Sequence, residues 1–119
     1  MKDFRKLKVW EKSHKLALLI YEITSDFPKT EIYGLTSQIR RAAVSIPTNI
    51  SEGSGRNSDA ELSRFLTISM GSASEVEYLL QLAHDLKYIT KENYTKMDSD
   101  INEIQKMLTS FIKRLRANR

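Results

Sequence analysis

Apolar residues recur every three or four positions along nearly the whole chain, which is the spacing of helices that bury one face. The first such segment ends at Phe27, because Pro28 follows and the residue before a proline disfavours helical backbone. Residues 28–34 are predicted to connect this segment to a second helix that begins near Leu35. Strand-like alternation between hairpin dipeptides is absent from the sequence, so the pattern predicts helices alone.

Local signals set the limits of the later helices. Pro47 has no amide hydrogen and clashes with the carbonyl four residues before it, so a kink or break is predicted there. A turn is expected at 53–55, where two glycines flank a serine. Ser58 and Glu61 have the spacing of a capping box and are predicted to start a third helix. Thr90 is predicted to cap a fourth helix.

Four predicted helices with short connections indicate neighbours that run in opposite directions. We therefore expect one domain, residues 1–119, of the all-α class: an antiparallel up-down-up-down four-helix bundle with a proline kink in its second helix. In that topology the start of the first helix, the turn at 53–57 and the end of the fourth helix share one pole.

Two of the predicted helices carry more apolar surface than one buried stripe requires. On the first helix Trp10, Ala17 and Tyr21 are predicted to face the core, and other apolar residues lie roughly opposite at ~100° per residue. One interpretation is a wide buried stripe under loop cover. We favour self-association, because exposed apolar patches mark interfaces. The candidate interface residues are Leu16, Leu19, Ile23, Ile68, Tyr78 and Leu82.

Composition narrows the class of protein. Hydrophobic residues make up 40% and charged residues 29% of the 119, which is typical of a globular domain. The absence of cysteine excludes disulfides, thiolate nucleophiles and cysteine-based zinc sites. The longest apolar run, 16–21, is far shorter than the ~20 residues that span a bilayer, and no secretory signal is recognisable. We expect a cytoplasmic protein without a membrane partner.

Positive charge concentrates at both ends of the chain. Residues 1–15 carry six Lys or Arg and two acids, and residues 110–119 carry four basic residues and no acid, whereas 16–109 is net acidic. The predicted topology gathers both ends at one pole, where contacts to phosphates would be independent of base sequence. The candidate nucleic-acid contacts are Lys2, Arg5, Lys6, Lys8, Arg40, Arg41, Arg56, Lys113, Arg114 and Arg116.

Arg40 and Arg41 have a second interpretation, because such a pair is also typical of a solvated helix edge or of ion pairs between subunits. Residues 53–56 are expected to form a helix-to-helix turn, with phosphate binding as the alternative. The small residues at 71–74 predict a close helix crossing. Ser45 or Asn49 is expected to satisfy the carbonyl that the proline leaves free.

Candidate catalytic chemistry is sparse. Glu11 and His14 have the Glu-x-x-His spacing of a di-iron bundle, but that site needs a second pair, and His84 follows Gln81 in place of a glutamate. Neither a Gly-x-Ser-x-Gly nucleophile elbow nor a phosphate-binding P-loop motif occurs. We expect no enzymatic activity, no catalytic residue, no metal site and no cofactor.

One stretch is far more specific than these: Ala42-Ala-Val-Ser-Ile-Pro-Thr-Asn-Ile-Ser-Glu-Gly-Ser-Gly-Arg56. It resembles the signature of the four-helix-bundle family of 23S rRNA intervening-sequence (S23) proteins. The likeness covers nearly the whole chain and includes Phe4-Arg-Lys-Leu-Lys-Val-Trp10, Glu31-x-Tyr-Gly-Leu-Thr-Ser-Gln38, Glu61-x-x-x-Phe65-Leu and Gly71-Ser-Ala-Ser-Glu75.

The resemblance extends to the accessory variability proteins of diversity-generating retroelements, which form pentameric barrels with basic surfaces and engage nucleic acid and a reverse transcriptase. It implies a homo-oligomer, with a pentamer as the expected assembly, and RNA, DNA or a protein such as a reverse transcriptase as partner. It brings no catalytic residues. The expected function is nucleic-acid binding within a ribonucleoprotein or retroelement-like assembly. A protein–protein scaffold without nucleic-acid binding is the alternative, and a salt titration separates the two.

Overall fold

The computed structural model describes residues 3–117, which form four long α-helices and two short 3₁₀-helices. In chain order these elements are η1 (Phe4–Lys6), α1 (Lys8–Thr24), η2 (Lys29–Glu31), α2 (Leu35–Ser54), α3 (Asp59–Asp85) and α4 (Lys91–Ala117). The described residues contain no strand, which confirms the all-α four-helix prediction. None of the helices in this part of the chain is long and apolar enough to cross a membrane.

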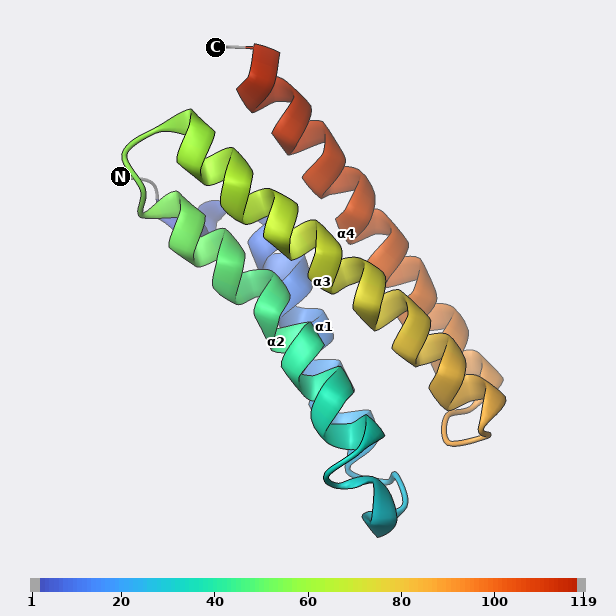
Figure 1. The fold of residues 1–119 in the computed structure, drawn as a ribbon. Coiled ribbons are helices and arrows are strands. Elements are labelled where there is room, and N and C mark those ends of the chain that lie inside the picture. Colours follow the sequence, from blue (N-terminus) through green and yellow to red (C-terminus); the bar gives the residue numbers. More distant parts are fainter. Residues whose placement is uncertain (1–2, 118–119) are drawn as a thin grey trace.

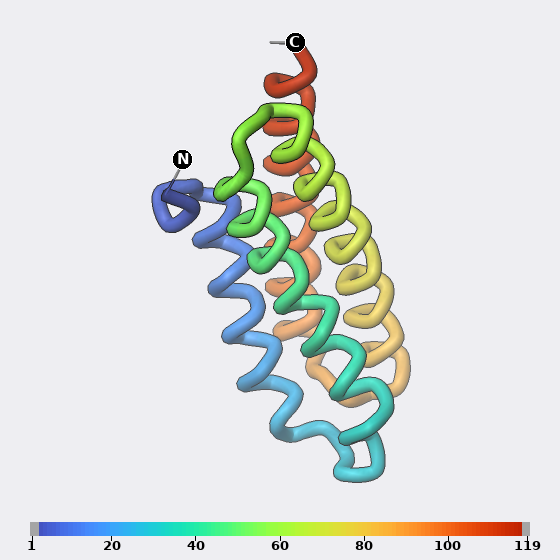
Figure 2. Tube along the Cα trace, turned by 60° about the vertical axis from the view of Figure 1, so that its left-hand side comes forward, coloured from blue at the N-terminus to red at the C-terminus, as the bar shows by residue number. Residues whose placement is uncertain are grey.

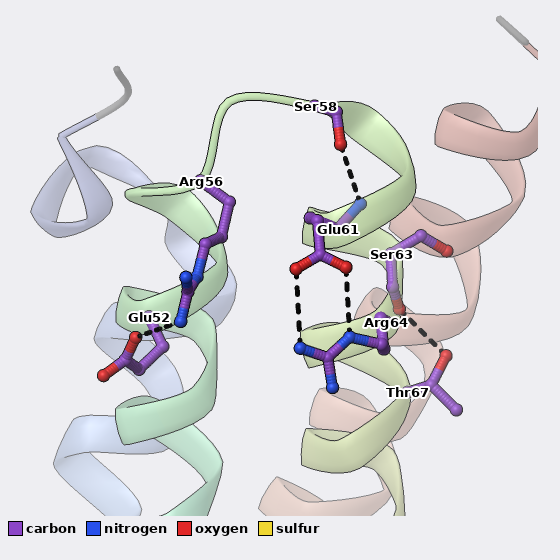
Figure 3. A network of polar contacts seen from close by, with 7 residues as sticks. All are labelled: Glu52, Arg56, Ser58, Glu61, Ser63, Arg64 and Thr67. Atoms are coloured by element: carbon purple, nitrogen blue, oxygen red, sulfur yellow. Dashed lines mark hydrogen bonds and ion pairs between the residues drawn. The ribbon is translucent and has the colours of Figure 1, made fainter.

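The helices begin where the sequence signals place them. The hydroxyl of Ser58 accepts a hydrogen bond from the amide of Glu61 at 3.1 Å, and the hydroxyl of Thr90 accepts from the amide of Asn93 at 3.1 Å. Each bond satisfies an amide that a helix start leaves without an intrahelical partner. Both predicted caps are therefore confirmed. The carboxylate of Glu61 is bonded to the guanidinium of Arg64 rather than closing the capping box (Figure 3).

Polar contacts between helices show how neighbours run. The hydroxyls of Ser45 and Ser72 are 2.8 Å apart, and Gln38 donates to Glu75 at 3.4 Å. As the residue number falls along α2, the number of the residue that it contacts on α3 rises, so these helices run in opposite directions. The start of α1, the α2–α3 turn and the end of α4 lie at the same end of the molecule, which we call the terminal pole (Figures 1 and 2).

The core-facing stripe of α1 differs from the predicted one. Val9, Leu16 and Ile20 are buried, whereas Leu18 and Tyr21 are 58% and 46% exposed. The prediction that Leu16 lies at an interface between copies is therefore wrong, because its side chain is 2% exposed within a single chain. The apolar residues of α1 that reach solvent lie on the side that flanks α2.

Two polar residues account for this error. Ser13 and Thr24 lie within the buried stripe of α1, where polar residues are uncommon. The hydroxyl of Ser13 donates to the carbonyl of Trp10 at 2.9 Å, and that of Thr24 donates to the carbonyl of Ile20 at 2.7 Å. Since both hydroxyls are satisfied by carbonyls of their own helix, their burial costs little free energy. The buried stripe therefore includes polar residues, which an analysis of apolar spacing alone leaves out.

α2 continues through Pro47 to Ser54, so the helix is not broken at the proline. The bend angle there stays a prediction. The turn starts after Ser54, later than expected, and Gly55 caps the helix. The amide of Asn49 donates to the carbonyl of Ser45 at 2.8 Å, so the expectation that it serves the carbonyl of Ala43 is wrong.

α2 and α3 approach each other closely at Gly53. A Cβ atom placed there would lie 2.9 Å from both Leu62 Cδ1 and Phe65 Cβ, so only glycine fits without movement. Gly71 lies at the surface, and a Cβ atom placed on it would meet nothing within 4 Å. The small residues at 71–74 therefore contribute to the crossing through Ser72, as described above, and not through the glycine.

Candidate nucleic-acid interface

A groove of about 1050 Å³ opens between η1 with the start of α1 and the last turns of α4. It lies at the terminal pole, where Figure 2 shows α4 extending beyond the other helices. We call it the terminal groove. Its apolar lining consists of Leu7, Val9, Met107, Phe111 and Leu115, and its charged lining consists of Lys6, Lys8, Glu103, Lys106, Lys113 and Arg114.

The charged lining is strongly unbalanced, with five cations against one carboxylate. That carboxylate, Glu103, is already 3.3 Å from the ammonium of Lys12. Within residues 3–117 no acid pairs with the ammonium groups of Lys6, Lys8 or Lys113. Uncompensated cations around one concave surface attract anions, because their fields add. The groove can therefore hold a polyanion.

Four of the predicted nucleic-acid contacts line this groove, whereas Arg116, near the end of the described residues, does not. Lys6, Lys8, Lys113 and Arg114 come together as predicted, although their sequence positions lie at opposite ends of the chain. Arg116 is exposed in the last turn of α4. The predicted contact at Lys2 lies outside the described residues.

Aromatic rings hold two of the arginines at this pole. The guanidinium of Arg114 lies 5.4 Å from the ring centre of Phe111, and that of Arg5 lies 4.5 Å from the ring centre of Phe4. Such cation–π contacts fix a charge without neutralising it. Arg5 is in addition 3.5 Å from Asp3, an exposed pair that solvent weakens.

Arg56 lies at the terminal pole but outside the groove. Its guanidinium is 3.3 Å from the carboxylate of Glu52 (Figure 3). It also lies 4.9 Å from the ring centre of Phe65. Nearby, the hydrogen bond from Arg64 and its positive charge hold the pKa of the Glu61 carboxyl below its usual range. Arg56 and Arg64 are thus partly compensated, and the lysines of the groove are the freer cations.

Arg40 has a structural role instead. Its guanidinium donates to the hydroxyl of Thr24 at 2.8 Å and to the carbonyl of Tyr21 at 3.3 Å, which satisfies groups at the end of α1. Arg41 is exposed and donates to Ser37 at 3.4 Å. Both lie in the first half of α2, toward the end of the molecule opposite the terminal pole (Figure 1). The structure does not bring them together with the other cations.

Lys106 and Phe111 line the groove although the sequence patterns do not single them out. Lys106 lies within the net acidic segment 16–109, so segment totals conceal it. A signal is present, because Lys106 and Lys113 are seven residues apart and therefore share one face of a helix. No sequence signal places Lys106 or Lys113 near Lys8, because only the packing of α1 beside α4 brings them together.

A second feature of the surface is apolar. Leu18, Tyr21 and Val44 are exposed and line a shallow hollow between α1 and α2, which we call the α1–α2 face. Of the predicted interface residues, Ile68 and Tyr78 are exposed on α3. Apart from the buried Leu16, the other members pack partly buried against the core: Leu19, Ile23 and Leu82.

The predicted Glu-x-x-His spacing has ordinary partners in the fold. Glu11 is 3.5 Å from the ammonium of Lys15, and the His14 ring stacks on Trp10 with 4.8 Å between ring centres. Among residues 3–117 no group of three or more histidine, aspartate or glutamate side chains could hold a metal ion.

Comparison with known proteins identifies a matching family and a similar solved structure. Residues 5–110 match the family model described as 23S rRNA-intervening sequence protein. A crystal structure of a protein with unknown function from the S23 ribosomal protein family of Bacteroides thetaiotaomicron VPI-5482 is similar, with a TM-score of 0.79 and 34% sequence identity. That match covers 88% of this chain and 98% of the other. No curated protein matches the sequence.

Proposed function

Because the chain belongs to the 23S rRNA-intervening sequence protein family, we propose that it is a non-enzymatic protein whose terminal groove binds the phosphates of RNA or DNA. The observation that carries this proposal is the five-to-one excess of cations in the groove. These cations come from η1, α1 and α4, so the bundle itself assembles the positive surface.

The proposed mechanism is electrostatic. Lysine and arginine groups displace the counterions condensed on a nucleic acid, and the released ions drive binding at low salt. Phosphate contacts position a strand but carry no base sequence. Binding is therefore expected to select nucleic acid over neutral polymers and to select weakly among base sequences.

We extend the proposal to a homo-oligomer, with a pentamer as the expected assembly. The exposed apolar residues of the α1–α2 face and of α3 support association between copies, because water-exposed apolar patches of this kind mark interfaces. Each added copy brings another terminal groove, so an assembly offers more cations to one strand than a single chain does. Such an assembly fits a ribonucleoprotein or retroelement-like particle.

The α1–α2 face favours one alternative function. Leu18, Tyr21 and Val44 offer an apolar surface that a protein partner, such as a reverse transcriptase, could cover. In that case the protein is a scaffold, and the cations of the terminal groove serve solubility alone.

A salt titration with dye-labelled RNA and DNA tests the proposal. We expect the logarithm of the binding constant to fall linearly with the logarithm of salt concentration. The double variant Lys8→Gln, Lys113→Gln is expected to make the slope of that line shallower by about 0.7 on a single strand, or about 0.9 on duplex DNA, for each phosphate that the variant no longer neutralises. The matched control is Lys29→Gln, Lys91→Gln, which removes two exposed lysines at the other end of the bundle and leaves the slope unchanged. Absence of binding at low salt rejects the proposal and leaves the scaffold.

A further inference from the structure

The terminal groove contains more than phosphate binding requires. Besides its cations it has an apolar lining, in which Leu7 and Met107 are half-buried and Phe111 is buried. Phosphate oxygens gain nothing from apolar side chains, and a surface that binds phosphates alone does better with polar groups there. The lining therefore indicates a ligand that is anionic on one side and apolar on the other.

We infer that the terminal groove binds a single-stranded polynucleotide, with its bases against the apolar lining and its phosphates against the lysines. This inference rests on the proposed function and names the form of nucleic acid. A single strand offers the flat faces of its bases to a protein, and stacking of bases on aromatic rings and guanidinium planes is a large part of how such strands are bound. A duplex keeps those faces stacked inside, so it cannot cover a recessed apolar lining.

The positions of the cations agree with a strand lying along the groove. Lys6 and Lys8 belong to η1 and α1, whereas Lys106 and Lys113 belong to α4, so cations flank the apolar lining from both sides. The lining on α4 runs from Glu103 to Leu115, which is about 18 Å at 1.5 Å per residue, enough for a short run of nucleotides.

Arg114 gives the groove a flat surface of its own. Its guanidinium lies over the ring of Phe111, at 5.4 Å from the ring centre, and is exposed to solvent. Guanidinium planes, like aromatic rings, are surfaces on which unpaired bases stack. The positive charge of Arg114 would also attract the phosphate next to a base that stacks there.

Charge complementarity favours a polynucleotide over the other ligand with this chemistry, an acidic amphipathic helix. A strand carries one negative charge on every nucleotide, so any register along the groove meets cations on both sides. A peptide helix needs acidic residues at fixed positions on both flanks of its apolar face. The five cations of the lining are spread over η1, α1 and α4, which suits a uniformly charged chain better.

The test compares dye-labelled oligo(U), oligo(dT) and a duplex of equal length at one low salt concentration. We expect at least one of the single strands to bind roughly tenfold more tightly than the duplex, since the stacking of a base on an aromatic ring is worth ~1–3 kcal/mol. Met107→Gln is expected to remove most of this preference and to leave the salt slope unchanged, because it retains every cation. Met70→Gln is the matched control, a half-buried methionine on α3 outside the groove.

Each other outcome has a distinct meaning. Equal affinity for single strand and duplex overturns the inference and leaves the proposed function intact. Binding of neither overturns both. An unchanged preference in Met107→Gln, with both methionine variants equally folded by circular dichroism, also overturns the inference. Capture of an acidic amphipathic peptide that Met107→Gln weakens, in the absence of oligonucleotide binding, assigns the groove to a peptide instead.

Discussion

α2 and α3 meet closely along their length, whereas α1 and α4 leave a groove between them at the terminal pole. The α2–α3 contact is closed by Gly53 and by the Ser45–Ser72 hydroxyl pair, and the hydroxyl of Ser69 donates to the carbonyl of Ile46 at 2.8 Å. The terminal groove has instead an open apolar lining, and the lysines around it have no acidic partner among residues 3–117.

The two regions therefore have different roles: the α2–α3 contact stabilises the fold, and the terminal groove is the proposed binding site. The most specific motif of the sequence, residues 42–56, lies on α2 and at its end, and its inward contacts close the α2–α3 crossing. The cations of the groove lie outside that motif. A distinctive sequence motif is thus explained here by packing, and the proposed ligand is bound where no comparable motif occurs.

The largest effect is expected at Gly53. In Gly53→Ala the new methyl group overlaps Phe65, whose Cβ atom cannot move without its helix, so we expect a loss of about 1–3 kcal/mol in the free energy of unfolding. Gly71→Ala is the matched control. It adds a methyl group in open space within α3, and helix propensity predicts a gain of about 0.5–1 kcal/mol.

Urea denaturation at fixed protomer concentration measures both changes, because association would otherwise alter the apparent stability. A similar gain in both variants would show that α2 and α3 separate at no cost, which contradicts the close crossing.

Removal of the Ser69 hydroxyl should have a smaller effect. Ser69→Ala deletes a fully buried hydrogen bond to the carbonyl of Ile46, and such bonds contribute about 0.5–1.5 kcal/mol. Ser74→Ala, at an exposed site on the same helix, is expected to change stability by less than about 0.5 kcal/mol. Thermal unfolding of the two variants distinguishes them. Equal stability would mean that solvent replaces the bond.

Lys106→Gln tests the terminal groove instead of the α2–α3 contact, so it should weaken binding and leave stability nearly unchanged. The ammonium of Lys106 is exposed and has no partner within residues 3–117, so stability is expected to change by less than about 0.5 kcal/mol. For a single strand, the slope of the logarithm of the binding constant against the logarithm of salt concentration should become shallower by about 0.7 if Lys106 contacts one phosphate. A loss of stability without a change in salt dependence would assign Lys106 to the fold.

The smallest effect concerns pH. The hydrogen bond from Arg64 lowers the pKa of Glu61 in the folded state, so this pair stabilises the protein above the ordinary carboxyl pKa and ceases to do so as pH falls through the lowered value. Glu61→Gln should therefore be less stable than the parent chain at neutral pH, with the difference vanishing in acid. Thermal unfolding across that pH range measures it, and a difference that is independent of pH would contradict the assignment.

Local features of the fold can be predicted from the sequence, and those that need distances cannot. The caps at Ser58 and Thr90 each join residues only three positions apart, and both predictions are confirmed. The predicted face of α1 is wrong, because Ser13 and Thr24 are buried with their own helix carbonyls as partners. Which glycine lies at a helix crossing depends on the neighbouring helix, and a single sequence does not contain that distance.

The candidate site likewise has one part that the sequence predicts and another that depends on distances between helices. The prediction that cations from both ends of the chain meet at one pole follows from topology, and four of those named line the groove. The apolar lining between them, and the contribution of Lys106, depend on how far α4 lies from α1. That separation results from packing along the whole bundle and has no local sequence signal.

The most direct test of the account is the reactivity of individual lysines toward an acetylating reagent, with and without oligo(U) or oligo(dT), measured by mass spectrometry. The account predicts that oligonucleotide protects the lysines of the terminal groove and leaves Lys29 and Lys91, at the opposite end, fully reactive. The expected protected residues are Lys6, Lys8, Lys106 and Lys113. Uniform protection of all lysines, or protection confined to Lys29 and Lys91, would contradict the terminal groove as the binding site.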